Sequence, residues 1–264
     1  MQVWKCPVCN EGLSELDRLF ECNKGHRFDK AKQGYINLLQ SQVSKTKQHG
    51  DEKEMVRARQ EFLDGAYYSC FKDALSDLVE LKPGSLVFDA GCGEGYYAQE
   101  FLSKHTVFGI DISKDAIIKA SKRNGDMKCA VASTYAIPLV NHVVDLAYSV
   151  FAPFSITEIN RILKVGGFFI ETFPLENHLK QLKAVLYPQP YINEVDIKEY
   201  DGFELVEVKR VETEIEINSS QDIQNLFKMT PYYHRTPEQG VKSLENLQSL
   251  KTEIGFGFAV YKKV

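Results

Sequence analysis

Hydrophobic and polar positions divide the chain into a polar, turn-rich first part and a longer part built from alternating short elements. Five apolar runs have the length of strands: 86–91, 106–113, 127–133, 143–150 and 168–173. Segments of helical length separate them, at about 96–102, 114–122 and 155–163. This alternation predicts an α/β fold with a parallel, doubly wound sheet and helices on both faces.

The flanks of this region carry other patterns. A helical pattern covers 54–81, with a break expected near Gly65. A helix at about 178–187 is followed by two β-rich stretches, 203–217 and 254–262, with a helical segment near 220–229 between them. The polar stretch 41–53 has no apolar periodicity and is expected to be an exposed linker. We therefore divide the chain into a small module (1–34), a linker (35–54) and the α/β domain (55–264).

Composition limits the function classes. The chain has 264 residues, of which 44% are hydrophobic and 26% charged, as in a globular protein with a real core. We find no apolar run of the ~18 residues that a membrane span needs and no signal-peptide pattern. Cysteines outside the first module are well separated, so we expect a cytoplasmic protein with no membrane partner.

The first module contains the pattern of a metal site. Cys6, Cys9, Cys22 and His26 follow the spacing C-x2-C-x12-C-x3-H, and turn residues surround them. Two closely spaced pairs can complete a tetrahedron, which is the geometry that Zn²⁺ adopts with thiolates and imidazole. Four protein ligands leave no open position, so the predicted zinc is structural. The alternative is a set of ordinary buried cysteines.

Charge is distributed unevenly. The net charge is −4, yet residues 22–50 contain six basic residues and the single acid Asp29. Such a stripe is typical of phosphate contact, although a solvated surface is the alternative. The basic residues are Lys24, Arg27, Lys30, Lys32, Lys45 and Lys47.

A glycine-rich loop follows the first strand of the α/β domain. In VFDAGCGEGYY, Asp89, Gly91, Gly93 and Gly95 occupy a strand-to-helix turn, where ligands of such sheets bind. The spacing is not that of a dinucleotide fold. Asp111 ends the second strand, where a carboxylate can accept both ribose hydroxyls of an adenosine. The expected cofactor residues are Asp89, Gly91, Gly93, Glu94, Gly95, Tyr96, Asp111, Ile112, Ala132 and Ser133.

This arrangement of strand, loop and downstream acid resembles the class I S-adenosylmethionine-dependent methyltransferases over roughly residues 55–175. In that fold the fourth strand leads to the reaction site, here FAPF (151–154). Phe151, Pro153 and Phe154 could stack on a planar substrate, or the phenylalanines could belong to the core. Tyr232 and Tyr233 could likewise stack on the substrate or belong to the core.

The whole chain resembles the bacterial 23S rRNA (guanine-N1)-methyltransferases of the RlmA family. The matching segments are 6–39, 50–68, 89–97, FAPF and KMTPYYHRTPE (228–238). The resemblance implies methylation of N1 of a guanine in a 23S rRNA hairpin, and a homodimer whose zinc modules form the RNA-binding cleft. Arg57 and Arg59 could reach RNA or close over the site, or pair with Glu54 and Glu61.

Residues for proton removal are less apparent. Asp145 and His234 are candidate bases, although Asp145 could be structural and a lone histidine is more often a surface or core residue. Two other functions remain open: a small-molecule methyltransferase with a purely structural zinc knuckle, and a non-catalytic RNA-binding protein with a methyltransferase-like fold.

Overall fold

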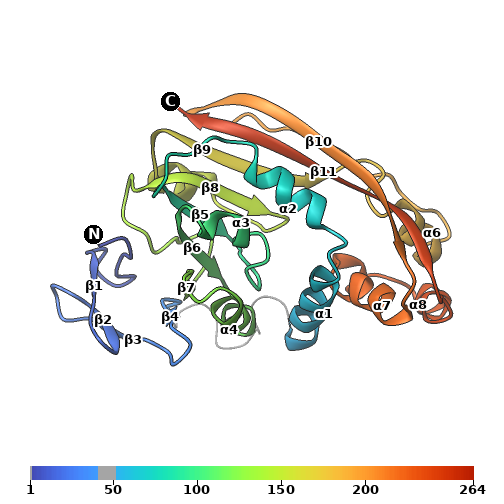
Figure 1. Ribbon diagram of the computed structural model, residues 1–264, viewed down its shortest axis with the longest axis horizontal. Coiled ribbons are helices and arrows are strands. Elements are labelled where there is room, and N and C mark those ends of the chain that lie inside the picture. The colour runs from blue at the N-terminus through green and yellow to red at the C-terminus, as the bar shows by residue number, and fades with distance from the viewer. Residues whose placement is uncertain (1, 41–51) are drawn as a thin grey trace.

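The computed structural model describes residues 2–40 and 52–264. The chain forms a small antiparallel sheet and a large eight-stranded sheet (Figure 1). The small sheet has the order β1-β2-β3 and consists of β1 (Leu13–Glu15), β2 (Leu19–Cys22) and β3 (Arg27–Asp29). We refer to residues 2–34 around it as the ribbon.

The centre of the large sheet is the predicted α/β unit. Its strands are β5 (Leu86–Ala90), β6 (Thr106–Asp111), β7 (Lys128–Val131), β8 (Val144–Val150) and β9 (Leu163–Pro174). They pair in parallel in the order β9-β8-β5-β6-β7, which confirms the five predicted strands. The order reverses direction at β5, so the carboxyl ends of β5 and β8 form the topological switch point at which ligands bind.

Both edges of this unit carry strands that make the sheet larger and mixed. The long antiparallel pair of β10 (Phe203–Ile217) and β11 (Leu250–Lys263) adds to the sheet through β11, which pairs antiparallel with β9, and the pair curves along one edge (Figure 1). At the other edge, β4 (Ile36–Asn37) pairs in parallel with β7. The prediction of a parallel sheet was therefore right for the centre and incomplete at the edges.

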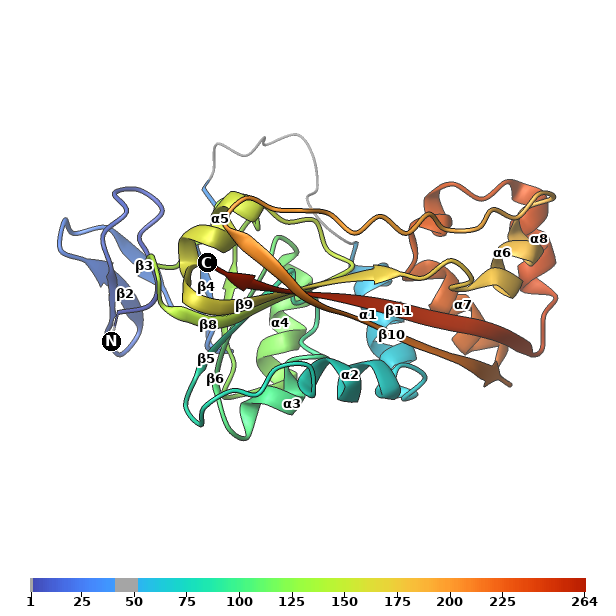
Figure 2. The same ribbon diagram turned by 90° about the horizontal axis from the view of Figure 1, so that it is seen from above.

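Helices lie around the sheet and at one end of it. They are α1 (Lys53–Asp64), α2 (Ser69–Ser76), α3 (Gln99–Leu102), α4 (Lys114–Arg123), α5 (Ile156–Ile162), α6 (Lys180–Leu186), α7 (Ser220–Lys228), the 3₁₀ turn η1 (Pro231–His234) and α8 (Glu238–Glu245). The predicted break near Gly65 is confirmed, because α1 ends there. Helices α6, α7 and α8 gather at the end opposite the ribbon (Figure 2).

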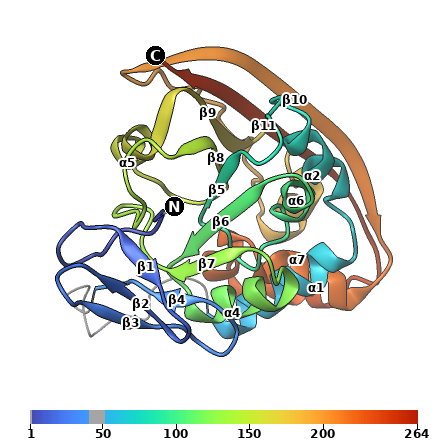
Figure 3. The ribbon, with the colours of Figure 1, turned by 60° about the vertical axis from the view of Figure 1, so that its left-hand side comes forward.

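Alternate residues of the central strands contribute to two hydrophobic cores, as expected for a sheet covered on both faces. Val87, Val107 and Leu146 belong to one core, which helices α1, α2, α3, α4, α6 and α7 cover. Phe88, Phe108 and Ala147 belong to the other, which α5 and the ribbon cover (Figure 3).

The ribbon is consequently part of the second core. Trp4 packs edge-on against Phe108, with 5.0 Å between the ring centroids, and forms an isolated bridge with Leu139. The strand β4 lies in the predicted linker, whose residues 41–51 are outside the described range. The proposed domain limits at 34 and 54 remain predictions.

Candidate active site and metal centre

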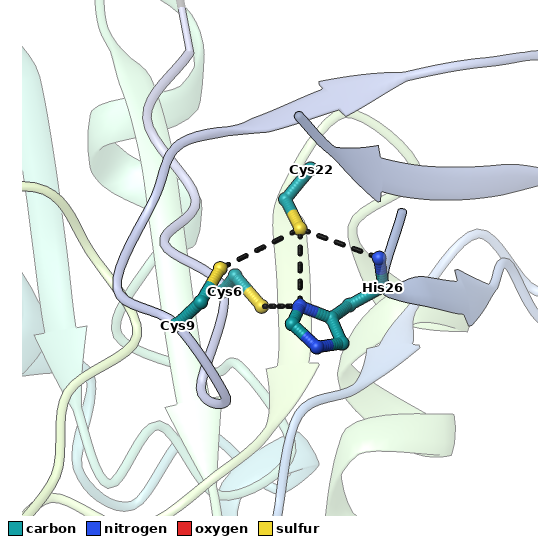
Figure 4. Close-up of side chains that lie close together, drawn as sticks. All are labelled: Cys6, Cys9, Cys22 and His26. Atoms are coloured by element: carbon teal, nitrogen blue, oxygen red, sulfur yellow. Dashed lines mark hydrogen bonds between the residues drawn. The ribbon is translucent and has the colours of Figure 1, made fainter. Parts of the chain in front are cut away.

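The four predicted metal ligands converge at one end of the ribbon. Cys6 and Cys9 come from the loop before β1, Cys22 ends β2, and His26 immediately precedes β3 (Figure 4). Their ligand atoms all lie within 4.8 Å of one another. The backbone N–H of His26 also donates to Sγ of Cys22 at 3.4 Å, an interaction that favours a thiolate.

The spacing of these atoms fits zinc. Nδ1 of His26 lies 3.6 Å from Sγ of Cys6 and 3.3 Å from Sγ of Cys22, and the sulfurs of Cys9 and Cys22 are 3.6 Å apart. A tetrahedron with Zn–S of about 2.3 Å and Zn–N of about 2.0 Å has edges of roughly 3.5–3.8 Å. The donor set therefore accommodates a four-coordinate zinc ion with no open position for chemistry.

The basic side chains of the ribbon have acidic neighbours. Lys24 lies 3.8 Å from Glu11, Arg27 lies 2.9 Å from Glu21, and Lys30 pairs with Glu15. Lys32 is exposed, whereas Lys45 and Lys47 lie outside the described residues. The charge count over residues 22–50 did not include these carboxylates, which precede residue 22 in sequence but lie beside the basic side chains in the folded protein. The proposed RNA contacts remain a prediction.

A cavity of about 710 Å³ opens at the carboxyl ends of the strands. Eight of the ten predicted cofactor residues line it: Asp89, Gly91, Gly93, Glu94, Tyr96, Asp111, Ile112 and Ser133. Gly95 and Ala132 do not. A Cβ on Gly95 would lie 2.6 Å from the side-chain nitrogen of Asn124, so this glycine serves the packing of the loop under α4.

The glycine loop has the open geometry of a cofactor cradle. Gly91 and Gly93 have φ of +81° and +54°, a region that side chains other than glycine rarely adopt. A Cβ on Gly91 would lie 2.4 Å from Cβ of Ala152, so the loop and the turn after β8 approach closely only because residue 91 is glycine. Around Gly93 no atom of the described residues lies within 4 Å of such a Cβ, which leaves room for a ligand.

Two carboxylates lie beside this loop and have different hydrogen-bond partners. Asp111 accepts the N–H of Gly93 at 2.9 Å and the N–H of Ser113 at 2.8 Å, which fixes its orientation. A carboxylate can accept several hydrogen bonds, and Asp111 lines the cavity, so its side chain is placed to accept ribose hydroxyls. Asp89 is buried and accepts the hydroxyl of Tyr148 at 3.0 Å. Burial raises the pKa of Asp89 to about 8, although the Tyr148 hydrogen bond opposes the shift.

Glu94 is held by a cation from the neighbouring helix. Nε of Arg123 lies 2.5 Å from its carboxylate, and the same guanidinium contacts Asp64 of α1 at 2.6 Å. Burial still raises the pKa of Glu94. This network joins the glycine loop to α4 and α1.

Arg59, also on α1, lines the cavity and donates to the carbonyl of Met229 at 3.2 Å. Arg57 instead pairs with Glu61 at 2.6 Å.

The predicted base-contact residues separate into two groups. Phe151, Pro153 and Tyr232 line the cavity, and Phe151 is 46% exposed with φ of +54°. Phe154 does not line it. Its ring packs on Phe169 at 4.9 Å between centroids, so Phe154 belongs to the second core.

Neither candidate base reaches the cavity. Asp145 lies near the beginning of β8, at the opposite end of the strand from the site, where it accepts the N–H of Leu86 at 2.8 Å and pairs with Lys164 at 2.7 Å. Its role is therefore structural. His234 is exposed on the 3₁₀ turn and packs against Tyr233.

Several cavity residues were absent from the sequence prediction, including Tyr68, Thr134, Tyr135, Thr172, Phe173, Pro174 and His178. Thr172, Phe173 and Pro174 end β9, so the rule that placed the site at the carboxyl ends of strands could have found them. Tyr68 and His178 come from loops and offer no such signal.

Comparisons with known proteins agree with this geometry. The family model described as RlmA, N-terminal, matches residues 4–47, and a methyltransferase domain model matches 87–167. The 23S rRNA (guanine(748)-N(1))-methyltransferase of Streptomyces fradiae is 34% identical over 69% of this chain and 67% of its own length. The chain belongs to the family of 23S rRNA (guanine-N1)-methyltransferases.

Other relatives in this family support the same assignment. The Bacillus subtilis protein YxjB, provisionally named as a 23S rRNA (guanine-N(1)-)-methyltransferase, is 29% identical over 94% of this chain and 92% of its own length. Among solved structures, the YcgJ protein of B. subtilis has a TM-score of 0.51 at 16% identity and covers 73% of this chain and 97% of its own, which shows the shared fold.

Family and site together assign S-adenosylmethionine and zinc as the cofactors of this protein. The cavity residues fit the first, and the Cys₃His cluster fits the second. Among the described residues, no helix is both long and apolar enough to cross a membrane.

Proposed function

We propose that this protein transfers the methyl group of S-adenosylmethionine to N1 of one guanine in a hairpin of 23S rRNA. The observation that carries this proposal is the presence of the zinc ribbon and the glycine-loop cavity in one chain, packed on a common sheet. The S. fradiae relative, which is named as such an enzyme, supports the same reaction.

Different residues of the cavity would hold the cofactor and the target base. The Gly91–Gly93 turn and Asp111 would hold the adenosine part of the cofactor, whose sulfonium supplies an activated methyl group. Phe151, exposed at the end of β8, offers an apolar face on which a base taken out of its stack can rest. Because the reaction is a direct displacement, alignment of the two partners can supply much of the rate enhancement.

The ribbon would hold the RNA in register. Zinc binding makes a small domain rigid, so that Lys24, Arg27, Lys30 and Lys32 can meet phosphates at fixed positions. The carboxylate partners of Lys24, Arg27 and Lys30 are exposed or half-buried, and such surface ion pairs are worth little, so phosphates can displace them. The proposal includes a homodimer, to be measured by light scattering of the purified protein with and without RNA.

The test is tritium transfer from S-adenosylmethionine to 23S rRNA, followed by primer extension. N1-methylguanine blocks Watson–Crick pairing, so reverse transcriptase should stop one nucleotide before a single guanine. Absence of a stop in treated rRNA would overturn the assignment. If the protein methylates small acceptors but not rRNA, and neutralising the ribbon cations leaves that transfer unchanged, a small-molecule methyltransferase gains support. Failure of calorimetry to detect S-adenosylmethionine binding would favour a non-catalytic RNA-binding protein.

A further inference from the structure

His178 is a buried imidazole that the proposed chemistry has not used. It lies between β9 and α6, is 7% exposed, and lines the cavity beside Phe151. Its ring centroid is 5.8 Å from that of Phe151 and 6.2 Å from that of Tyr68. The imidazole therefore lies beside the aromatic ring that we expect to carry the target base.

The hydrogen bonding of this histidine fixes its tautomer. The backbone N–H of Gly255 donates to Nδ1 at 3.2 Å, so the proton of the neutral ring is on Nε2. Burial, together with the nearby charge of Lys183, lowers the pKa of His178 to about 3. Within residues 2–40 and 52–264, this is the one hydrogen bond recorded for the side chain. At neutral pH His178 is thus a fixed N–H donor and cannot act as a base.

Two further polar atoms at the cavity have no hydrogen-bond partner in the part of the chain that the structure describes. The hydroxyls of Tyr68 and Thr172 are buried without a hydrogen bond among the described residues, although both residues line the cavity. Thr172 pairs with Val150 in the sheet, directly before Phe151. Buried polar groups are rarely left unsatisfied. Because the ring of Tyr68 lies near His178 and Thr172 pairs with the residue before Phe151, this end of the cavity offers polar groups to a ligand.

We propose that the Nε2–H of His178 donates a hydrogen bond to O6 of the target guanine, which both selects guanine and stabilises it as its N1 proton leaves. This inference rests on the proposed function. It names a residue that contacts the substrate, and therefore predicts effects on turnover as well as on binding.

The chemistry requires such a donor. Guanine N1 carries a proton, which must pass to water before or during the transfer. The electron pair left on N1 forms the bond to the methyl carbon, and the pair of the breaking carbon–sulfur bond stays on sulfur as a neutral thioether. While N1 is losing its proton, negative charge develops on O6. A preorganised donor in a buried site stabilises such charge more than water does.

The same donor discriminates between purines. Guanine presents a carbonyl oxygen at position 6, whereas adenine presents an amino group there. Opposite the N–H of His178, the amino group would leave two donors facing each other without an acceptor. Sites that hydrogen-bond a substrate reject analogues that leave their buried groups unpaired.

Two substitutions separate this role from a structural one. His178→Asn keeps an acceptor near the position of Nδ1 for the Gly255 N–H but cannot reach as far as Nε2. His178→Gln places an amide donor near the position of Nε2. His105→Asn is the matched control, because His105 lies outside the cavity lining. Thermal unfolding and calorimetry with S-adenosylmethionine establish that each variant folds and binds its cofactor.

We expect His178→Asn to lower kcat on the rRNA hairpin by about 100-fold, the usual effect of losing one such donor, with a smaller change in KM. The pH at which its rate rises should be higher than for the wild type, because without this donor the bound guanine loses its N1 proton less readily. His178→Gln should recover much of the rate, and His105→Asn should retain all of it.

The outcomes distinguish the two proposals. A wild-type protein that produces no primer-extension stop overturns the function and this inference together. A normal wild-type stop with an unchanged kcat and pH profile for His178→Asn overturns this inference alone. If His178→Asn unfolds, a stable His178→Gln variant decides: near-native turnover supports the donor role, and inactivity contradicts it.

Discussion

Trp4 of the ribbon lies edge-on against Phe108 of β6, with their ring centroids 5.0 Å apart. Trp4 is 5% exposed and belongs to the same core as β5 and β8. The metal-binding part and the cofactor-binding part therefore share hydrophobic surface, and the stability of one depends on the other.

Removal of zinc should consequently weaken the whole protein. The chain has a single tryptophan, so its fluorescence reports the ribbon–sheet contact directly. We expect a strong chelator to shift the emission of Trp4 to longer wavelength and to lower the melting temperature of the α/β domain. Trp4→Ala should destabilise the zinc-loaded protein by about 3–5 kcal/mol, as for other buried aromatic residues. An unchanged melting temperature after chelation would contradict the shared core.

The close approach of Gly91 to Ala152 leads to a second prediction. In Gly91→Ala, the new methyl group would lie 2.4 Å from Cβ of Ala152, and φ of +81° would be strained. Relaxation of the free loop would relieve about 1–2 kcal/mol of strain, which binding of the cofactor must restore, and each 1.4 kcal/mol is about tenfold in affinity. We expect S-adenosylmethionine to bind at least about tenfold more weakly, as measured by calorimetry.

A matched pair of variants tests the cause of this loss. Ala152→Gly removes the atom that collides, so the double variant should regain the steric part of the affinity but not the part due to φ. Gly125→Ala is the control, because nothing lies within 4 Å of the added Cβ and its backbone is not left-handed. Equal affinity for Gly91→Ala and Gly125→Ala would show that the loop does not hold the cofactor.

The central fold was predictable because its determinants are local in sequence. Five apolar runs with turn residues between them specify five buried strands, and the rule for switch points then places the glycine loop and Asp111 together. The edges were less predictable. A strand of two residues, such as β4, has no periodicity of its own, and its partner β7 lies about ninety residues later in the sequence.

The site shows the same division between local and distant determinants. In FAPF, the sequence cannot tell which phenylalanine faces the cavity. The left-handed backbone at Phe151 exposes that ring, while Phe154 packs on Phe169. His178 gave no signal, because its tautomer depends on the N–H of Gly255, 77 positions away in the chain. Asp145, which the sequence left open as a base or a structural residue, lies near the beginning of its strand, and the rule that ligands bind at the carboxyl ends already favoured the structural role.

The raised pKa of Asp89 predicts opposite effects on stability and on binding. The pKa of this carboxyl is about 8 in the folded protein and about 4 in the unfolded chain. Between these values the folded protein binds a proton that the unfolded chain does not, so stability falls as pH rises. Asp89→Asn should remove this loss. Its free energy of unfolding should exceed that of the wild type at pH 8 and match it near pH 4, as measured in urea.

Cofactor binding should show the reverse dependence for the wild type. S-adenosylmethionine carries positive charge, which favours the ionised form of Asp89. Binding at pH 7 should therefore release a proton, visible as a dependence of the calorimetric enthalpy on the buffer, and the affinity should increase towards pH 8. Asp89→Asn should bind more weakly and without this pH dependence. Proton release that persists in Asp89→Asn would assign it to another group.

The ion pairs of the ribbon allow its role in RNA binding to be tested in both directions. Arg27 lies 2.9 Å from Glu21, and Lys24 lies 3.8 Å from Glu11. If these cations contact phosphates, replacing any one of them by alanine should reduce the steepness of the plot of log K against log salt concentration by about 0.7–0.9, where K is the association constant for RNA. Glu21→Gln removes a carboxylate that competes with the phosphate for Arg27, so it should strengthen binding of the rRNA hairpin. A small-molecule methyltransferase would show neither effect. Fluorescence titrations of labelled hairpin at several salt concentrations, with the distant pair variant Glu238→Gln as control, measure both changes.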